Sequence, residues 1–274
     1  MTSTAGAAAS TFMAADGAGY ERQMGRFSAR LAPRLIEFAG IADGERVLDV
    51  GCGTGSLALA LLRNQRHKRI DAVDFSPIYV AYAKGRSNDP RLQFQVADAC
   101  ALPFADATFD HTASLLMLAF VPEADKAVRE MRRVTRPGGT VAAAMWDARG
   151  GLVFARMFWD TAAMLDPGAV ERRARAQSRP MTRPGDFTRA WTAAGLQNVV
   201  EDALTIRMEF ASFDDYWSPF QGKDGPFAEY VATLGDQQRT ALQEALRAAY
   251  VAGDPDGPRS YAATSWVVRG MVPN

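Results

Sequence analysis

Three glycines form a short loop between an apolar stretch at 46–50 and a helical pattern at 56–62. They are Gly51, Gly53 and Gly55. Glycine lets the backbone turn sharply and lets a ligand approach without meeting a side chain. A dinucleotide-binding loop prefers the spacing G-x-G-x-x-G, whereas here Ser56 stands where that pattern has its third glycine. The loop therefore predicts a nucleotide-like ligand but does not match the dehydrogenase pattern.

Three acidic residues follow or end three successive predicted strands. Asp49 lies just before the glycine loop, Asp74 ends the second strand, and Asp98 follows the third. Asp49 would repel a pyrophosphate and attract a positive group. Asp74 is placed to accept both ribose hydroxyls of an adenosine, which also fits NAD, and Asp98 to accept from an adenine amine. Each has an alternative role: Asp49 could cap the next turn, Asp74 could cap the helix at Ser76, and Asp98 could be a solvated loop residue. Together they favour one shared ligand, the positively charged nucleoside S-adenosylmethionine (SAM).

The elements that must position these residues alternate along the chain. Apolar strand patterns are separated by helical ones, which predicts a doubly wound, mostly parallel sheet. The first five predicted strands are 46–50, 69–74, 92–96, 109–115 and 140–146. Predicted helices are 20–40, 56–62, 124–134 and one opened by Ser76 and Pro77.

After residue 146 the pattern changes and predicts sheet completion together with a helical cover. Helices are expected at 152–165 and 184–195, a mostly helical run at 213–246, and two more strands at 199–210 and 262–269. The prediction is a seven-stranded α/β domain over 20–274, with a cofactor-binding core at 20–146 and completion and cover at 147–274. Residues 1–19, rich in Ala, Ser, Thr and Gly, are predicted to be a disordered tail.

Four segments carry a family resemblance. VLDVGCGTG at 47–55 resembles motif I of the class I SAM-dependent methyltransferases. DAVDFS at 71–76, VADACALPFADATFD at 96–110 and EMRRVTRPGGTVAAAMW at 130–146 are similar to the later motifs, in order and spacing. The resemblance is nearest to the small-molecule group that includes the ubiquinone- and menaquinone-biosynthesis methyltransferases. It implies a Rossmann-like fold, SAM as cofactor and S-adenosylhomocysteine as product.

The resemblance also implies roles for individual residues. Asp49 and the backbone of Gly51 and Gly53 would hold the methionine end, with Cys52 packed in the same loop. Asp74 would take the ribose, Phe75 would pack beside the adenine, and Asp98 and Ala99 would read the adenine edge. Ser114 and Leu115 would line the cofactor near its methyl group. Residues 20–28 resemble a lid in which Tyr20 covers the cofactor and Arg26 meets its carboxylate, the alternative being an ordinary surface helix.

The catalytic group is not predicted. Many relatives carry a histidine after the fourth strand, where this chain has Ala119 and Phe120, and it also lacks the Arg-Asn pair of the quinone enzymes. A quinone acceptor is therefore not expected. His111 lies inside a predicted strand, and Cys52 and Cys100 are expected to be structural. Methyl transfer from a sulfonium proceeds by alignment of an in-line displacement, so a base is needed only if the acceptor must lose a proton.

The acceptor is expected at the carboxyl ends of the strands, and an aromatic or apolar small molecule fits the residues there. The predicted walls are Trp146, Phe154, Phe158, Trp159, Tyr216, Trp217 and Phe220. The alternative is that these side chains are core of the helical cover. An arginine cluster favours either an anionic acceptor or a solvated helix face. Its members are Arg172, Arg173, Arg175, Arg179 and Arg183.

Composition narrows the remaining possibilities. The 31 basic and 31 acidic residues give a formal net charge of zero, which disfavours a nucleic-acid partner. Two cysteines and two histidines without ligand spacing predict no disulfide framework, no metal and a cytoplasmic location. No apolar run reaches membrane-spanning length. Monomer and homodimer stay open, as do a nicotinamide-dependent oxidoreductase and a non-catalytic SAM-binding module as alternative functions.

Overall fold

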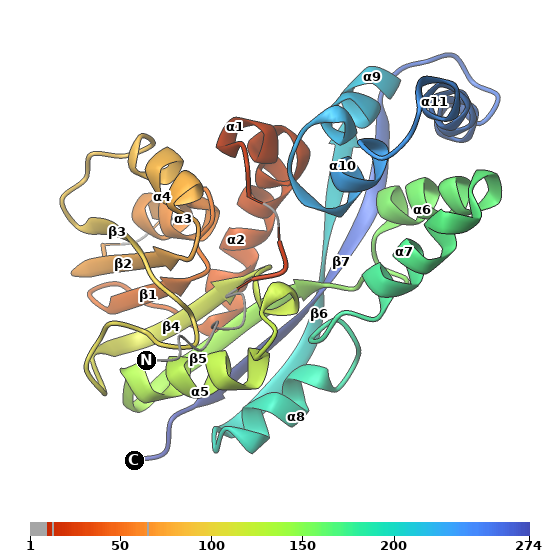
Figure 1. Ribbon diagram of the computed structural model, residues 1–274. Helices are drawn as coiled ribbons and strands as arrows, with labels where there is room; N and C mark the ends of the chain where they lie inside the picture. The colour runs from red at the N-terminus through yellow and green to blue at the C-terminus, as the bar shows by residue number, and fades with distance from the viewer. Residues whose placement is uncertain (1–9, 13, 65) are drawn as a thin grey trace, which may run out of the picture.

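The computed structural model describes residues 10–12, 14–64 and 66–274. Seven strands form one sheet in the order β3-β2-β1-β4-β5-β7-β6 (Figure 1). The strands are β1 (Arg46–Val50), β2 (Arg69–Asp74), β3 (Leu92–Val96), β4 (Phe109–Leu115), β5 (Thr135–Trp146), β6 (Gln197–Phe210) and β7 (Arg259–Met271). The pairs among β1 to β5 are parallel, and β7 runs antiparallel to both β5 and β6. The predicted seven-stranded, mostly parallel sheet is confirmed.

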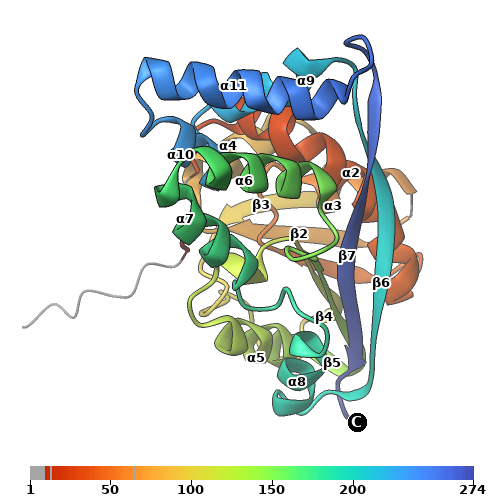
Figure 2. The same cartoon turned by 90° about the vertical axis from the view of Figure 1, so that its right-hand side faces the viewer.

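Helices cover both faces of this sheet (Figure 2). On one face lie α2 (Arg26–Ala39), α3 (Ser56–Asn64) and α4 (Pro77–Lys84), and on the other α5 (Ala124–Val134) and α8 (Asp186–Ala193). The helix predicted at 20–40 is continuous with two preceding turns, α1 (Gly17–Tyr20) and the π-helical η1 (Glu21–Gly25). It ends at Gly40, whose φ of 71° is the left-handed conformation that glycine adopts at helix ends.

A helical cover lies at the end of the molecule toward which β6 and β7 extend (Figures 1 and 2). It consists of α6 (Val153–Leu165), α7 (Pro167–Gln177), α9 (Phe213–Trp217), η3 (Ser218–Gln221), α10 (Gly225–Val231) and α11 (Asp236–Val251). Five of the predicted acceptor-wall aromatics are buried core here, at most 2% exposed, as the alternative expected. They are Phe154, Phe158, Tyr216, Trp217 and Phe220. No helix in the described part of the chain is long and apolar enough to cross a membrane.

Two predictions about local structure need correction. Strand β5 begins at Thr135 rather than at 140, because a register shift opposite β4 takes up the Pro-Gly-Gly segment that indicated a turn. The disorder predicted for 1–19 does not hold for 10–12 and 14–19: Thr11 N–H donates to the Phe120 carbonyl at 2.8 Å, and α1 begins at Gly17. Residues 1–9 and 13 lie outside the described residues.

Candidate functional site

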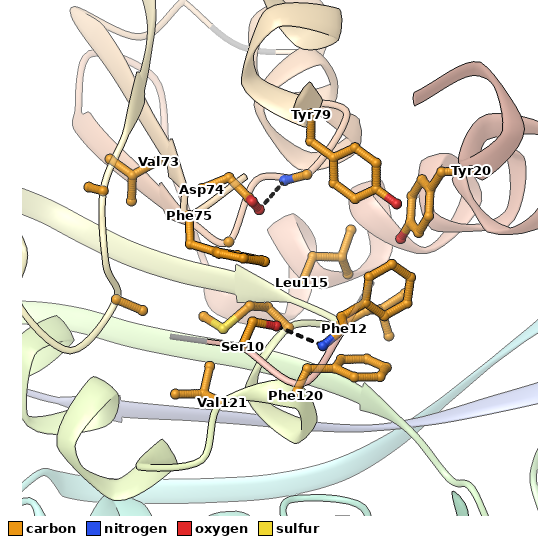
Figure 3. A pocket seen from close by; sticks show the side chains of 16 residues that line it. Ser10, Phe12, Tyr20, Val73, Asp74, Phe75, Tyr79, Leu115, Phe120 and Val121 are labelled. Carbon is orange, nitrogen blue, oxygen red and sulfur yellow. Dashed lines mark hydrogen bonds between the residues drawn. The ribbon is translucent and has the colours of Figure 1, made fainter. Parts of the chain in front are cut away.

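Two adjoining cavities open at the carboxyl ends of β1, β2 and β4, where the strand order reverses between β1 and β4. The larger has a volume of about 660 Å³, including space open to solvent. Tyr20, Tyr79, Phe75, Phe12 and Phe120 face it from different elements (Figure 3). The smaller, of about 270 Å³, lies against the glycine loop and shares Tyr20, Gly51, Gly53 and Leu115 with the larger. A reversal of strand order is where doubly wound sheets bind ligands.

Asp49 lines the smaller cavity and is fully buried. Its Oδ2 accepts a hydrogen bond from Ala58 N–H at 3.0 Å, so part of its role is to hold the first turn of α3. Its Oδ1 has no partner among the described residues. Burial, with a smaller effect from nearby Asp74, raises the pKa of the Asp49 carboxyl to about 8. A buried acceptor without a donor fits a bound cationic amine, such as that of the SAM methionine end.

The glycine loop leaves space that side chains would fill. Gly51 has φ +76°, and a Cβ there would lie 2.2 Å from Met117 Cγ. Gly53 has φ +51°, and a Cβ there would meet nothing within 4 Å, because it would point into open space. Both glycines line both cavities. The loop is therefore a backbone cradle that a nucleoside can approach closely.

Asp74 combines the predicted position with the alternative capping role. Its Oδ2 accepts from Gly53 N–H and its Oδ1 from Ser76 N–H, each at 2.9 Å. Burial raises its pKa, and these two hydrogen bonds oppose that effect. Asp74 also lines the larger cavity beside Phe75, which is 37% exposed. One carboxylate thus fixes the glycine loop and borders the space predicted for ribose and adenine.

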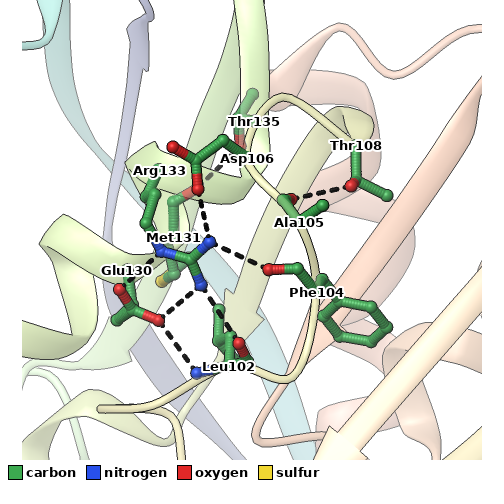
Figure 4. A network of polar contacts seen from close by, with 9 residues as sticks. All are labelled: Leu102, Phe104, Ala105, Asp106, Thr108, Glu130, Met131, Arg133 and Thr135. Carbon is green, nitrogen blue, oxygen red and sulfur yellow. Dashed lines mark hydrogen bonds and ion pairs between the residues drawn. The ribbon is translucent and has the colours of Figure 1, made fainter.

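The loop after β3 brings Ala97 and Ala99 to the larger cavity, whereas Asp98 does not line it. Asp98 Oδ1 instead accepts from Cys100 N–H at 2.8 Å, which closes a turn. Arg133 of α5 holds the rest of this loop (Figure 4). Its guanidinium donates to the Leu102 carbonyl at 3.0 Å, the Phe104 carbonyl at 2.8 Å, Asp106 Oδ1 at 2.7 Å, and Glu130 Oε1 and Oε2 at 2.7 and 2.8 Å.

Two further predicted site residues are not in the cavities. Ser114 is fully buried in β4, and its Oγ has no partner among the described residues, while Leu115 lines both cavities. Arg26 pairs with Asp215 at 2.8 Å and stacks over Phe27 and Phe210. Because its guanidinium is held by that carboxylate, Arg26 joins α2 to α9 instead of lining the cofactor space.

The segment predicted as a lid places Tyr20 at the cavities. Tyr20 borders both cavities, and burial raises the pKa of its phenol to about 12. Glu21 Oε1 accepts from Thr54 Oγ1 at 2.5 Å and from Arg86 Nη1 at 2.8 Å. Arg86 Nη1 also donates to the Thr54 carbonyl at 2.9 Å. These contacts, the Glu21 latch, fasten the lid to the glycine loop. No pattern in the sequence predicts these contacts.

A third cavity of about 910 Å³, partly open to solvent, adjoins the first. Phe12, Tyr20, Leu116 and Phe120 border both. Three of the predicted aromatic walls line it, namely Trp146, Phe154 and Trp159. Of the arginine cluster Arg179 lines it, while Arg173 and Arg175 pair with Asp160 and Glu171. Sequence reasoning missed Phe12 because a single aromatic in an Ala- and Ser-rich stretch carries no periodic signal.

Comparison with known proteins agrees with this geometry. Residues 48–143 match the family described as Methyltransferase domain. An uncharacterized protein of Mycobacterium tuberculosis is 37% identical over 225 residues, covering 78% of this chain and 77% of that protein. Erythromycin 3''-O-methyltransferase of Saccharopolyspora erythraea is 38% identical over 117 residues, covering 41% of this chain and 38% of that enzyme.

Solved structures show the same fold. Phosphoethanolamine N-methyltransferase 2 of Haemonchus contortus, in complex with S-adenosyl-L-methionine, has a TM-score of 0.57 at 16% identity, covering 89% of this chain and 53% of that chain. The YcgJ protein of Bacillus subtilis has a TM-score of 0.57 at 18% identity, covering 91% of this chain and 99% of that chain. The chain belongs to the SAM-dependent methyltransferases. SAM is its cofactor.

Proposed function

We propose that this protein moves the methyl group of SAM to a small-molecule acceptor held in the third cavity. The observation that carries the proposal is a wall shared by two cavities. The cavity proposed for the nucleoside, which Asp74 lines, and the largely apolar third cavity are both bordered by Phe12, Tyr20, Leu116 and Phe120. Supporting relatives include enzymes named for methylating erythromycin and 27-O-demethylrifamycin SV. The family match favours this function over the nicotinamide-dependent alternative.

In this proposal the residues of the chain bind the cofactor and align it with the acceptor. Bound SAM supplies a methyl group activated by its positively charged sulfur. Asp49 would hold the methionine amine, Asp74 the ribose, and Ala99 and Phe75 the adenine. Among the described residues that line the third cavity, none is Asp, Glu, His, Lys or Cys. Tyr20, with its pKa raised to about 12, keeps its proton near neutral pH. Alignment and exclusion of water are therefore proposed as the main contributions of the protein.

The cellular setting is also a proposal. Cys52 and Cys100 are both free and buried. Unpaired buried cysteines are typical of a reducing compartment, which supports the cytoplasm.

Two matched glycine variants test the site, and turnover tests the reaction. Gly53→Ala places a methyl group in the cradle, whereas Gly44→Ala places one outside the three cavities, with similar backbone strain (φ +82°) and equally open surroundings. We expect Gly53→Ala to weaken calorimetric affinity for S-adenosylhomocysteine about tenfold or more, and Gly44→Ala to leave it unchanged.

Wild-type protein is then incubated with SAM and a panel of small apolar acceptors, and S-adenosylhomocysteine is measured. Equal affinities of the two glycine variants would refute the site. Tight NAD binding without SAM binding would refute the function.

A further inference from the structure

Two residues that line the third cavity carry buried hydrogen-bond donors that have no partner among the described residues. Gln23 of η1 and Trp146 at the end of β5 both line it, and each residue is only 7% exposed. Gln23 Nε2 and Trp146 Nε1 have no hydrogen-bond partner among the described residues. A buried donor left unpaired destabilises the protein. A ligand with acceptor oxygens would remove this destabilisation.

The same cavity contains a cation that no carboxylate neutralises. Arg179 lines it, with its guanidinium 4.4 Å from the centre of the Phe120 ring. Its one polar side-chain contact among the described residues is a 3.5 Å approach of Nη1 to Thr11 Oγ1. Burial lowers the Arg179 pKa and Glu229 acts in the opposite direction, but no ion pair joins the two in the described part of the chain.

A second arginine that lines the cavity differs from Arg179 because it is paired with a carboxylate. Arg156 also lines it, but its Nη2 pairs with Asp160 at 3.0 Å and its Nη1 donates to the Arg149 carbonyl at 2.8 Å. Arg156 is therefore satisfied by the protein. Among the described residues, Arg179 retains guanidinium donors without a carboxylate partner in a largely apolar cavity.

We propose that the acceptor is a hydrophobic carboxylate, whose negative group pairs with Arg179 and whose oxygens accept hydrogen bonds from Gln23 and Trp146. This inference rests on the proposed function, because it identifies the third cavity as the acceptor site. Apolar walls from Phe154, Trp159 and Phe227 match a ring or chain. A planar guanidinium matches a carboxylate in geometry, and a carboxylate oxygen pair accepts several donors. In the described part of the chain no acidic residue lines the cavity, so no carboxylate there competes for the Arg179 guanidinium.

Binding of 2-naphthoate and its neutral isostere 2-naphthamide tests the proposal without turnover. Calorimetry at pH 7 with protein saturated by S-adenosylhomocysteine should show 2-naphthoate binding about 10- to 100-fold more tightly. Arg179→Met should abolish this preference, and Arg179→Lys should keep part of it because the charge remains. Trp146→Phe should weaken binding of the carboxylate while keeping an aromatic wall.

Arg175→Met is the matched control, since Arg175 belongs to the same arginine cluster but is exposed and paired with Glu171. It should leave both affinities unchanged. Equal binding of the two probes, or binding of neither, overturns the carboxylate proposal while S-adenosylhomocysteine still binds. A protein that fails to bind S-adenosylhomocysteine at all contradicts the proposed function instead.

Discussion

Asp49 has one oxygen held by the backbone and one that no donor reaches in the described part of the chain. Water is kept away from both, so the free protein favours the protonated form and the pKa rises to about 8. The unfolded chain has the ordinary pKa of 3.8. Because the folded pKa is the higher one, the stability contribution of this group is present below about pH 4 and is lost as the pH rises through about 8. A positively charged ligand reverses the preference, since it stabilises the carboxylate.

Affinity for S-adenosylhomocysteine, which carries the same amine as SAM, should therefore increase with pH between 6 and 8. The gain approaches about tenfold per pH unit well below the pKa and is accompanied by proton release. Calorimetry in buffers of different ionisation enthalpy measures both quantities. Asp49→Asn, which keeps an acceptor for Ala58, should bind more weakly and show a flat profile over this range. A flat profile for the wild-type protein would contradict the assigned role of Asp49.

At the scale of elements, the lid is held to the glycine loop by few contacts. Helix α2 is anchored by buried apolar residues such as Phe27 and Leu31, whereas η1 is fixed on this side by the Glu21 latch. π-Helical turns are rare and occur mostly at functional sites, where they reorient side chains. The Glu21 latch thus joins the lid to the glycine loop.

Glu21→Ala should release the lid from the glycine loop, because Thr54 and Arg86 lose a charged acceptor. Dissociation of S-adenosylhomocysteine should then become about tenfold faster. Stopped-flow displacement measures the rate. Glu37→Ala, on an exposed part of α2 with an ion pair of 4.0 Å to Arg34, is the control and should leave it unchanged. If both variants dissociate at the wild-type rate, the latch has no part in retention.

At the scale of the whole molecule, Asp224 joins three segments that are distant in the sequence. It precedes α10, and its carboxylate accepts from Ala15 N–H at 2.7 Å, Asp16 N–H at 3.1 Å and Tyr79 Oη at 2.8 Å. Asp224 is buried, so these donors depend on it. This carboxylate therefore joins Ala15 and Asp16 to α4 and to the start of α10.

Asp224→Ala should free the N-terminal segment. We expect faster proteolytic cleavage within residues 10–20 and roughly tenfold weaker S-adenosylhomocysteine binding, as three hydrogen bonds to a buried carboxylate are lost. Asp214→Ala, on the exposed side of α9, is the control. An unchanged cleavage pattern in Asp224→Ala would show that the segment is held by other contacts.

The core elements were predictable because each carries its own local signal. Alternating and apolar patterns located β1 to β4 to the residue, and Ser76 with Pro77 marked the start of α4. The positions of Asp49, Asp74 and the glycines followed from strand ends meeting at one sheet edge. Arg26, Asp98 and Ser114 do not line the cavities, and their positions could not be predicted because their contacts depend on other parts of the fold. Phe12, Asp224 and the contacts of Glu21 were missed for the same reason, as each acts on a segment far away in the chain.

Tyr20 lines all three cavities. It is therefore a wall shared by the cofactor space and the cavity proposed for the acceptor. A movement of Tyr20 large enough to release S-adenosylhomocysteine would also open the third cavity, so departure of the product and access of the acceptor would be linked through one side chain.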